Sequence, residues 1–378
     1  MIRLLHLADL HLGYKPAFLG GEKAVLRQKE RDRLLEKAVD FSLDPANRID
    51  MVLIVGDLFE THRPEERLVK AVIEQLERLV SAGIFCATVP GNHDELSYHD
   101  SVYRAKKEKW PGLLVQNPMP ELVVHTEIKG TSLWIYSLAY TGGVTRVESL
   151  GDFPREAKEG IHIGAFHGTI DWNPGERSLP LKSSELAKAG YHYLAMGHLH
   201  RYQQQKVGTS LAVYPGAVES KSLSDIGEGH LTVVNFAPGP GSSVNISIEK
   251  PAIKVRPHER IELDLSPLED KEALLKKCRS YEDPEKIVEF VLKGAPSFTA
   301  SKEELLRELE ESFFYISITD ESSHIDLALL EKLADEHTVR GKFVKRIMAV
   351  MAEAKDPREK EVLKLALLKG LAAFKRSE

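Results

Sequence analysis

The sequence contains few cysteines and no excess of positive charge. Its 378 residues include two cysteines, Cys86 and Cys278, and these are not spaced as a CxxC pair. The spacing excludes a thiolate zinc site or a redox pair, and we expect both thiols to be structural. The formal net charge of -6 argues against a protein that coats nucleic acid by bulk charge, although it leaves room for a local basic groove.

Targeting signals are also missing from the first residues. The stretch IRLLHLADLHLGY has a single Arg before its apolar part and carries two His and an Asp within it. This is typical neither of a signal peptide nor of a membrane span, so we expect a cytoplasmic protein with no membrane association. With 42% hydrophobic residues, a chain of this length can bury a sizeable core and predicts two or three domains.

Short apolar runs alternate with amphipathic patterns along much of the chain. IRLLHLAD, IDMVLIVGD and GIFCATVPGNHDE predict buried strands, while residues 22–43 and 63–83 have the 3.6-residue apolar spacing of helices. Further strands are predicted in residues 113–116, 121–128, 132–140, 161–168, 191–200, 211–220 and 230–236. The pattern predicts an α/β fold, a layered sandwich of mixed sheets flanked by helices.

The later part of the chain has a different pattern of predicted elements. APGPGSS, residues 237–243, is either a hairpin loop or a domain boundary, because strand alternation resumes directly after it. We expect a main domain over residues 1–260, a small α/β cap over 261–320 that is a candidate for DNA recognition, and C-terminal helices over 321–378. The last segment carries an apolar stripe that either packs on its own domain or docks onto a partner: Phe343, Val344, Ile347, Met348 and Met351.

Histidine is concentrated in the first 200 residues, which hold eleven of the fifteen. In ADLHLG, Asp9 and His11 are two apart, so both side chains leave the same face of an extended chain. His198 and His200 repeat this spacing in GHLH. Taken singly, such residues are ordinary turn, capping or core residues. Together they all follow predicted buried strands, where an α/β sheet presents its site; the full set also includes Asp57, Asn92, His93 and His167.

The chemistry of this set favours metal ions. Carboxylate, amide and imidazole groups without a thiolate suit Mn²⁺, Fe²⁺ or Zn²⁺ better than Ca²⁺. Seven ligands are too many for one ion but suit two ions about 3.5 to 4 Å apart that share one carboxylate, an arrangement used in phosphoryl displacement. The sequence therefore predicts two divalent metal ions, most readily Mn²⁺.

The ordered motifs D-x-H, G-D, G-N-H-[DE], H-G and G-H-x-H resemble those of the calcineurin-like metallophosphoesterases. The phrases LLHLADLHLG, GDLFE, PGNHDE, GHLH and YPGAVES look most like the SbcD branch, the nuclease subunit of SbcCD-type DNA repair complexes. The resemblance in motifs runs from residue 2 to about 220. It implies DNA as substrate, an SbcC-like coiled-coil ATPase as partner and a homodimer.

The resemblance also implies a role for each site residue. One metal would be held by Asp9, His11, Asp57 and His200, and the other by Asp57, Asn92, His167 and His198, with Asp57 as the bridge. His93 would then bind no metal and would lie beside the leaving oxygen as a proton donor or transition-state stabiliser. On this hypothesis the strand before GNHDE stops where Asn92 delivers an oxygen to a metal and His93 faces the phosphate.

One position departs from the family pattern. Archaeal and eukaryotic relatives carry a His three residues after the bridging Asp, a residue associated with exonuclease action, and here that position is Glu60. Many bacterial members also lack this His. The sequence therefore predicts a nuclease without fixing exonuclease polarity or endonuclease preference.

Contacts to DNA are expected from basic residues near the site motifs. The candidates in YKPAFLGGEKAVLRQKERDR are Lys15 and Arg27, and those in YRAKKEKW are Arg104 and Lys106. Basic helix faces are more often solvated surface than phosphate contacts. Two other functions remain open: a small-molecule phosphodiesterase or phosphatase on the same metal core, and a noncatalytic DNA-tethering scaffold. The long stretch of chain beyond the motifs argues against the first, and the complete ligand set with His93 argues against the second.

Overall fold

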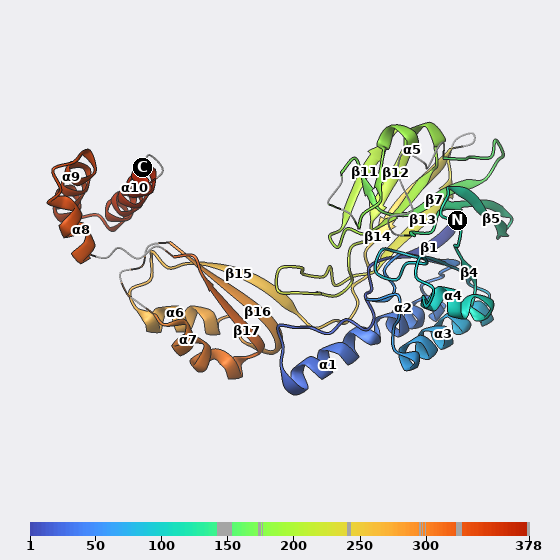
Figure 1. The fold of residues 1–378 in the computed structure, drawn as a ribbon, viewed down its shortest axis with the longest axis horizontal. Coiled ribbons are helices and arrows are strands. Elements are labelled where there is room, and N and C mark those ends of the chain that lie inside the picture. The colour runs from blue at the N-terminus through green and yellow to red at the C-terminus, as the bar shows by residue number, and fades with distance from the viewer. Residues whose placement is uncertain are drawn as a thin grey trace. The chain divides into compact units, whose positions relative to one another are not determined.

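The computed structural model describes residues 1–141, 153–172, 175, 177–239, 243–294, 296, 298, 300–322 and 327–375. The chain divides into two compact units, Met1–Val255 and Arg256–Glu378. Unit 1 contains all of the candidate site residues, and each unit is described by itself (Figure 1).

The first sheet of unit 1 has six strands in the order β14-β13-β1-β2-β3-β4. Strands β1 (Ile2–Leu7), β2 (Met51–Val55), β3 (Phe85–Val89) and β4 (Leu113–Leu114) run parallel. β13 (Thr232–Pro238) is antiparallel to β1, and β14 (Val244–Glu249) is antiparallel to β13. The Gly/Pro break at residues 237–243 therefore joins two strands of a hairpin, although its residues 240–242 lie outside the described part.

The second sheet also has six strands, in the order β11-β12-β10-β7-β6-β5. β6 (Thr131–Ser137), β7 (Ile161–His167), β10 (Tyr193–Gly197) and β12 (Ser210–Tyr214) are parallel, while β5 (Glu121–Ile128) and β11 (Gln203–Val207) form antiparallel edges. A short pair, β8 (Thr169–Ile170) and β9 (Pro180–Leu181), lies outside both sheets. The predicted sandwich of two mixed sheets is confirmed.

The two sheets pack face to face through β2, β7 and β10, and helices cover their outer sides (Figure 1). α2 (Leu34–Leu43) packs against α3 (Glu66–Ser81), which contacts β3, and α5 (Ser183–Ala189) contacts β11. α4 (Val102–Lys106) continues into a 3₁₀ turn at Lys107–Lys109. Every residue of β2 is buried because both faces of this strand are covered, which explains its unbroken apolar run MVLIV.

The sequence predicts one helix over residues 22–43, whereas the structure has two. α1 (Gly21–Asp32) ends before Arg33, whose backbone (φ -93°, ψ 3°) leaves the α-helical region, and α2 begins directly after it. The break follows residues that are fixed from outside the helix. The buried Arg31 guanidinium donates to the Leu10 carbonyl, and the Asp32 carboxylate accepts from the Gly13 N–H at 2.6 Å. These contacts outweigh the helical periodicity.

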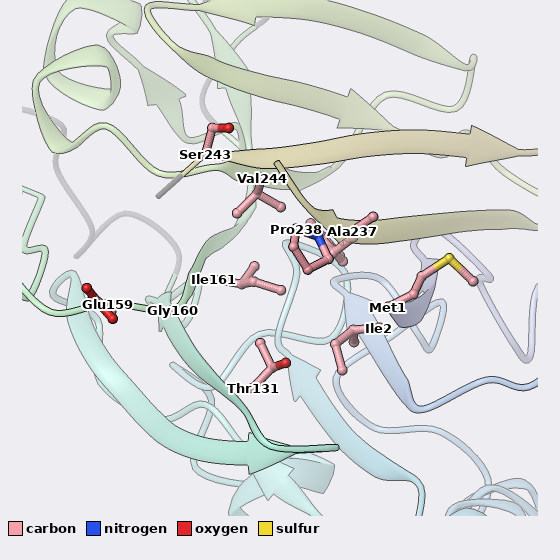
Figure 2. Close-up of a pocket in the computed structure, with 11 residues that line it drawn as sticks. Met1, Ile2, Thr131, Glu159, Gly160, Ile161, Ala237, Pro238, Ser243 and Val244 are labelled. Carbon is pink, nitrogen blue, oxygen red and sulfur yellow. The ribbon is translucent and has the colours of Figure 1, made fainter. Parts of the chain in front are cut away.

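A hollow of about 270 Å³ lies at the amino ends of β1, β6 and β7 (Figure 2). Its wall is formed by apolar residues such as Ile2, Ile161 and Val244, and Glu159 supplies an ionisable side chain. Candidate site residues lie at the carboxyl ends of β1 and β7, so this hollow is at the opposite edge of the sandwich.

Unit 2 contains a parallel three-stranded sheet and five α-helices among its described residues. The sheet has the order β15 (His258–Asp264), β16 (Asp283–Lys293) and β17 (Phe313–Asp320), and shares an apolar core with α6 (Lys271–Arg279) and α7 (Lys302–Leu309), which a 3₁₀ turn at Glu310–Ser312 follows. A separate cluster joins α8 (Leu327–Ala334), α9 (Val339–Glu353) and α10 (Pro357–Lys375). In the described part of the chain, no helix has the length and apolar character needed to cross a membrane.

Three histidines make the stability of unit 1 sensitive to acid. Burial lowers the pKa of His6 from its ordinary 6.5 to about 3, and burial lowers the pKa of both His192 and His198 to about 4. Unfolding returns each pKa to about 6.5. Between pH 6.5 and about 4 these three residues therefore bind more protons in the unfolded chain, and the stability that they contribute above pH 6.5 is lost as the pH falls.

We expect the free energy of unfolding of unit 1 to fall between pH 7 and 5 by roughly 2 kcal/mol from His6 alone. Urea unfolding in EDTA, followed by tryptophan fluorescence, measures it, because Trp110, Trp134 and Trp172 all belong to unit 1. His6→Phe keeps a ring in the core without its titration and should flatten the dependence. An unchanged pH dependence in this variant would refute the assignment to His6.

Candidate metal centre

The eight predicted site residues lie together at one edge of unit 1. Asp9 and His11 follow β1, Asp57 follows β2, and Asn92 and His93 follow β3. His167 is the last residue of β7, and His198 directly follows β10, which pairs with β7 in parallel. Because the carboxyl ends of these strands meet, residues far apart in sequence converge there, and His200 is brought in with them.

The backbone at several of these residues is strained. Four of them have positive φ values, in the left-handed region that residues other than glycine rarely adopt. The values are 54° at Asp9, 47° at His11, 51° at Asp57 and 95° at His198. Each such residue costs of order 1–3 kcal/mol, and such strain concentrates at functional sites. Neighbouring glycines make room for the same residues: a Cβ at Gly91 would overlap the Asp57 carboxylate.

The first group of ligand atoms comprises Asp9, His11, Asp57 and His200. The Nε2 atoms of His11 and His200 lie 3.0 Å apart. His11 Nε2 is 3.7 Å from Asp57 Oδ2, and His200 Nε2 is 3.9 Å from Asp9 Oδ1. Asp9, His11 and Asp57 are almost completely buried. These four side chains therefore direct nitrogen and oxygen atoms at one small volume.

The second group comprises Asp57, Asn92, His167 and His198. Asn92 Oδ1 lies 2.9 Å from both His167 Nε2 and His198 Nδ1. His167 Nε2 is also 3.5 Å from Asp57 Oδ2. The same oxygen of Asp57 thus faces His11 in the first group and His167 in the second, which is the position of a bridging ligand. Its other oxygen, Oδ1, accepts from the His93 N–H at 2.8 Å.

The donor set fits cations. His11 Nδ1 lies 2.9 Å from a Glu60 carboxylate oxygen, and His200 Nδ1 lies 2.5 Å from one of Asp225. Carboxylates only accept, so a neutral ring with its hydrogen on Nδ1 suits both contacts and presents a lone pair at Nε2. Lys221 Nζ, a donor, also lies 3.3 Å from His11 Nδ1. Two lone pairs 3.0 Å apart repel unless a cation lies between them or one ring is protonated. This is how metal-binding histidines are commonly prepared.

The pKa values of His167 and Asp57 indicate that the site favours a positive charge beside the Asp57 carboxylate. Burial opposes the charge on His167, but the Asp57 carboxylate outweighs it and raises the pKa of His167 to about 9. The pKa of Asp57 lies well below its ordinary value because His167 outweighs the effect of burial. Burial lowers the pKa of His11, which favours its neutral form. A proton or a metal ion would supply this charge.

His93 lies beside the first group of ligand atoms. Its ring meets that of His11 edge-on with centroids 4.7 Å apart, and 27% of its side chain is exposed. His93 Nδ1 lies 3.0 Å from the Glu60 carbonyl oxygen, so Nδ1 donates and Nε2 is left for other partners. His93 is also within metal-ligand reach of His11 and Asp57. Geometry alone therefore allows both a ligand and a proton-donor role.

Sequence reasoning missed a layer of residues behind the ligands. Glu60 binds His11 and also Lys221, whose Nζ lies 2.9 Å from Glu60 Oε2, and these contacts outweigh burial and lower the pKa of Glu60 to about 2. Asp94 is buried and joins two site loops: it accepts from the Phe59 N–H at 3.0 Å and from the Gly91 N–H at 2.7 Å. Asp94 could have been found from the sequence because it belongs to the GNHDE motif, whereas Asp225 lies in no motif that would indicate its role.

The basic residues predicted to contact DNA differ in their exposure and in their ion pairs. Lys15 and Arg104 are exposed, and Lys106 pairs with Glu66 at 2.5 Å. Arg27 is buried, and its guanidinium lies 2.5 Å from Glu219 and 2.7 Å from Glu30. This placement argues against a phosphate contact by Arg27, because the charge is already paired inside the protein.

Glu60 should hold His11 in its metal-binding orientation. Glu60→Gln removes the charge that fixes the His11 tautomer, and we expect the affinity for Mn²⁺ at the first group to fall about 10- to 100-fold. Isothermal titration calorimetry on the metal-free protein measures this. Glu65→Gln, which removes an exposed carboxylate five residues away, is the matched control. Equal Mn²⁺ affinities in the two variants would rule out the role given to Glu60.

Comparison with known proteins supports this interpretation of the site. The chain is 26% identical over 247 residues to the uncharacterized metallophosphoesterase YhaO of Bacillus subtilis, a match that covers 63% of this chain and 58% of YhaO. It is 27% identical over 240 residues to the DNA double-strand break repair protein Mre11 of Methanopyrus kandleri, covering 60% of this chain and 50% of that protein.

A third relative is the SbcD component of the nuclease SbcCD of Bacillus subtilis, which is 25% identical over 288 residues, or 67% of this chain and 72% of the relative. The matched part thus spans little more than half the length of YhaO and half that of the M. kandleri Mre11. The model of the calcineurin-like phosphoesterases matches residues 2–202, which include every candidate ligand. The chain belongs to the calcineurin-like phosphoesterase family.

Proposed function

We propose that this protein is a two-metal-dependent DNA nuclease of the SbcD type. The observation that carries the proposal is the shared oxygen of Asp57, which lies 3.7 Å from His11 Nε2 and 3.5 Å from His167 Nε2. It joins two groups of ligand atoms into one dinuclear arrangement, the kind of metal site that this family uses. We assign Asp9, His11, Asp57 and His200 to one metal, and Asp57, Asn92, His167 and His198 to the other.

The bound ions, most readily Mn²⁺, would supply an activated water and stabilise the charge that develops on the phosphate. The protein's own residues position these groups. Asp225 and Glu60 fix the ring orientations of His200 and His11, and Asp94 holds the loops that carry Asp57 and Asn92. His93, with its Nδ1 occupied by the Glu60 carbonyl oxygen, would use Nε2 to protonate the departing sugar oxygen.

DNA as substrate is supported by the names of two relatives, a double-strand break repair protein and a component of a nuclease. It is also supported by exposed cations on the segments that follow the site motifs, namely Lys15 and Arg104, with Lys106 nearby. The alternative is a small-molecule phosphodiesterase on the same core, and the relative YhaO leaves it open. The noncatalytic scaffold is disfavoured because His93, held through Nδ1 by the Glu60 carbonyl oxygen, presents Nε2 beside a complete set of candidate ligands.

The C-terminal helices are the proposed docking site for a coiled-coil ATPase, and a homodimer is proposed with it. In the predicted stripe on α9, Val344 is buried and the other side chains are half-buried against α8 and α10, so these side chains already have partners within unit 2. Apolar residues that remain exposed on α9 and α10 are Val339, Val350, Val362 and Leu365, at 75%, 40%, 60% and 41%. We propose these residues as the apolar part of the docking surface.

Cleavage of end-labelled linear duplex DNA with Mn²⁺, beside cleavage of a small chromogenic phosphodiester, tests the proposed function. His93→Ala should keep both metals and lose about 10²- to 10⁴-fold in turnover, as expected for loss of a proton donor. Asn92→Ala should instead weaken one metal site. His99→Ala removes an exposed histidine of the same loop as a control. The proton-donor role of His93 is falsified if His93→Ala retains full activity, and loss of a metal in that variant would make His93 a ligand. A wild-type protein that cleaves the small diester but no DNA would contradict DNA as the substrate.

A pull-down with an SbcC-like ATPase tests the docking surface. Val362→Glu combined with Leu365→Glu places charge on the exposed face of α10, and we expect it to abolish binding while unit 1 stays active on the small diester. Deletion of residues 321–378 should have the same effect. Binding that survives the deletion would exclude these helices as the docking site.

A further inference from the structure

A second hollow, of about 370 Å³, opens beside the metal centre. It shares His200 with the first group of ligands, and its other walls come from the segment after β7 and from the edge strand β11. Its volume falls in the range of about 300 to 1,000 Å³ that is usual for small-ligand sites. The lining includes one tryptophan, one arginine and two glutamines, namely Trp172, Arg201, Gln203 and Gln205.

The aromatic wall of this hollow includes the indole of Trp172. Trp172 is 56% exposed, whereas Trp110 and Trp134 are each 6% exposed. The backbone that leads to Trp172 is held by two hydrogen bonds: the Thr169 hydroxyl donates to the Trp172 carbonyl at 2.5 Å, and the Ile170 N–H donates to the Tyr214 hydroxyl at 3.1 Å. No ring stacks on the Trp172 indole among the described residues. A large apolar face is therefore exposed in the hollow that His200 also lines.

The polar walls suit an anionic ligand with hydrogen-bonding edges. Arg201 is exposed, directly follows the ligand His200, and has no ion-pair partner in the described part of the chain. Gln203 and Gln205 are two apart on β11, so their exposed amides leave the same face of the strand. None of the described residues that line the hollow is acidic. An aromatic face, a guanidinium and two amides match the base, the phosphate and the base edges of a nucleotide.

We propose that this hollow binds one unpaired nucleotide next to the scissile phosphate. Within a duplex, neighbouring bases cover both faces of each base, so stacking on Trp172 requires a base that has left the helix. Trp172 stacks on the base, Arg201 neutralises a flanking phosphate, and the two glutamines contact the base edge. The nuclease would then favour frayed ends, overhangs and single strands over blunt duplex. This specificity rests on the proposed nuclease function, whereas nucleotide binding by the hollow can be tested without it.

Binding is measured first, in EDTA, with a short single-stranded oligodeoxynucleotide as the probe. Since Trp172 is the exposed tryptophan, stacking should quench the emission of the wild-type protein, and Trp172→Ala should abolish the quenching and weaken binding roughly ten-fold. Trp172→Phe keeps an aromatic face and should recover part of the affinity. Arg201→Gln should weaken binding and reduce its salt dependence. Lys206→Gln removes an exposed charge from the neighbouring position of β11 and should change neither.

Equal affinity of the wild type and Trp172→Ala for the single strand would overturn the subsite. So would an equal loss of affinity for blunt duplex DNA in Trp172→Ala, since that loss would not depend on an unpaired base. Cleavage assays separate this proposal from the nuclease function. If the wild type cuts no DNA but Trp172 is still quenched, the subsite stands and the nuclease function fails. If DNA is cut equally well by wild type and Trp172→Ala, the subsite falls and the nuclease function stands.

Discussion

The candidate metal centre depends on one buried carboxylate, that of Asp57. Its Oδ2 is the oxygen that both groups of ligands share, and its Oδ1 accepts the backbone N–H of His93. A charge at this depth is costly unless cations or donors surround it. The raised pKa of His167, about 9, shows that the surroundings attract positive charge to this point. The other residues of the site bring positive charge to Asp57 or hold in place the groups that do so.

Supplying positive charge at a fixed point requires ligands that do not move. Carboxylates behind the ligand rings provide this: Glu60 for His11 and Asp225 for His200. The left-handed backbone at Asp9, His11 and Asp57 lowers stability, and the packing of the buried sheets around these residues offsets this loss. Glu60 is occupied by His11 and Lys221, so the residue that departs from the pattern of some relatives has a structural task here.

The sequence predicted the sandwich and the convergence of the eight site residues because both follow from local patterns: apolar runs mark buried strands, and parallel strands bring their carboxyl ends together. It did not predict contacts that depend on distant partners. The helix break at Arg33 and the burial of Arg27 are set by contacts with other segments, and periodicity carries no information about them. Asp225 supports His200 from a loop with no recognisable motif.

The ligands come from both layers of the sandwich. Asp9, His11, Asp57 and Asn92 follow strands of the first sheet, while His167, His198 and His200 belong to the second. Ions bound among them would act as non-covalent cross-links between two sheets that otherwise meet through apolar packing. A ligand that binds only the folded state adds its binding free energy to stability. Chelation would therefore weaken the contact between the sheets as well as empty the site, so that unit 1 would unfold at lower denaturant concentration without its ions.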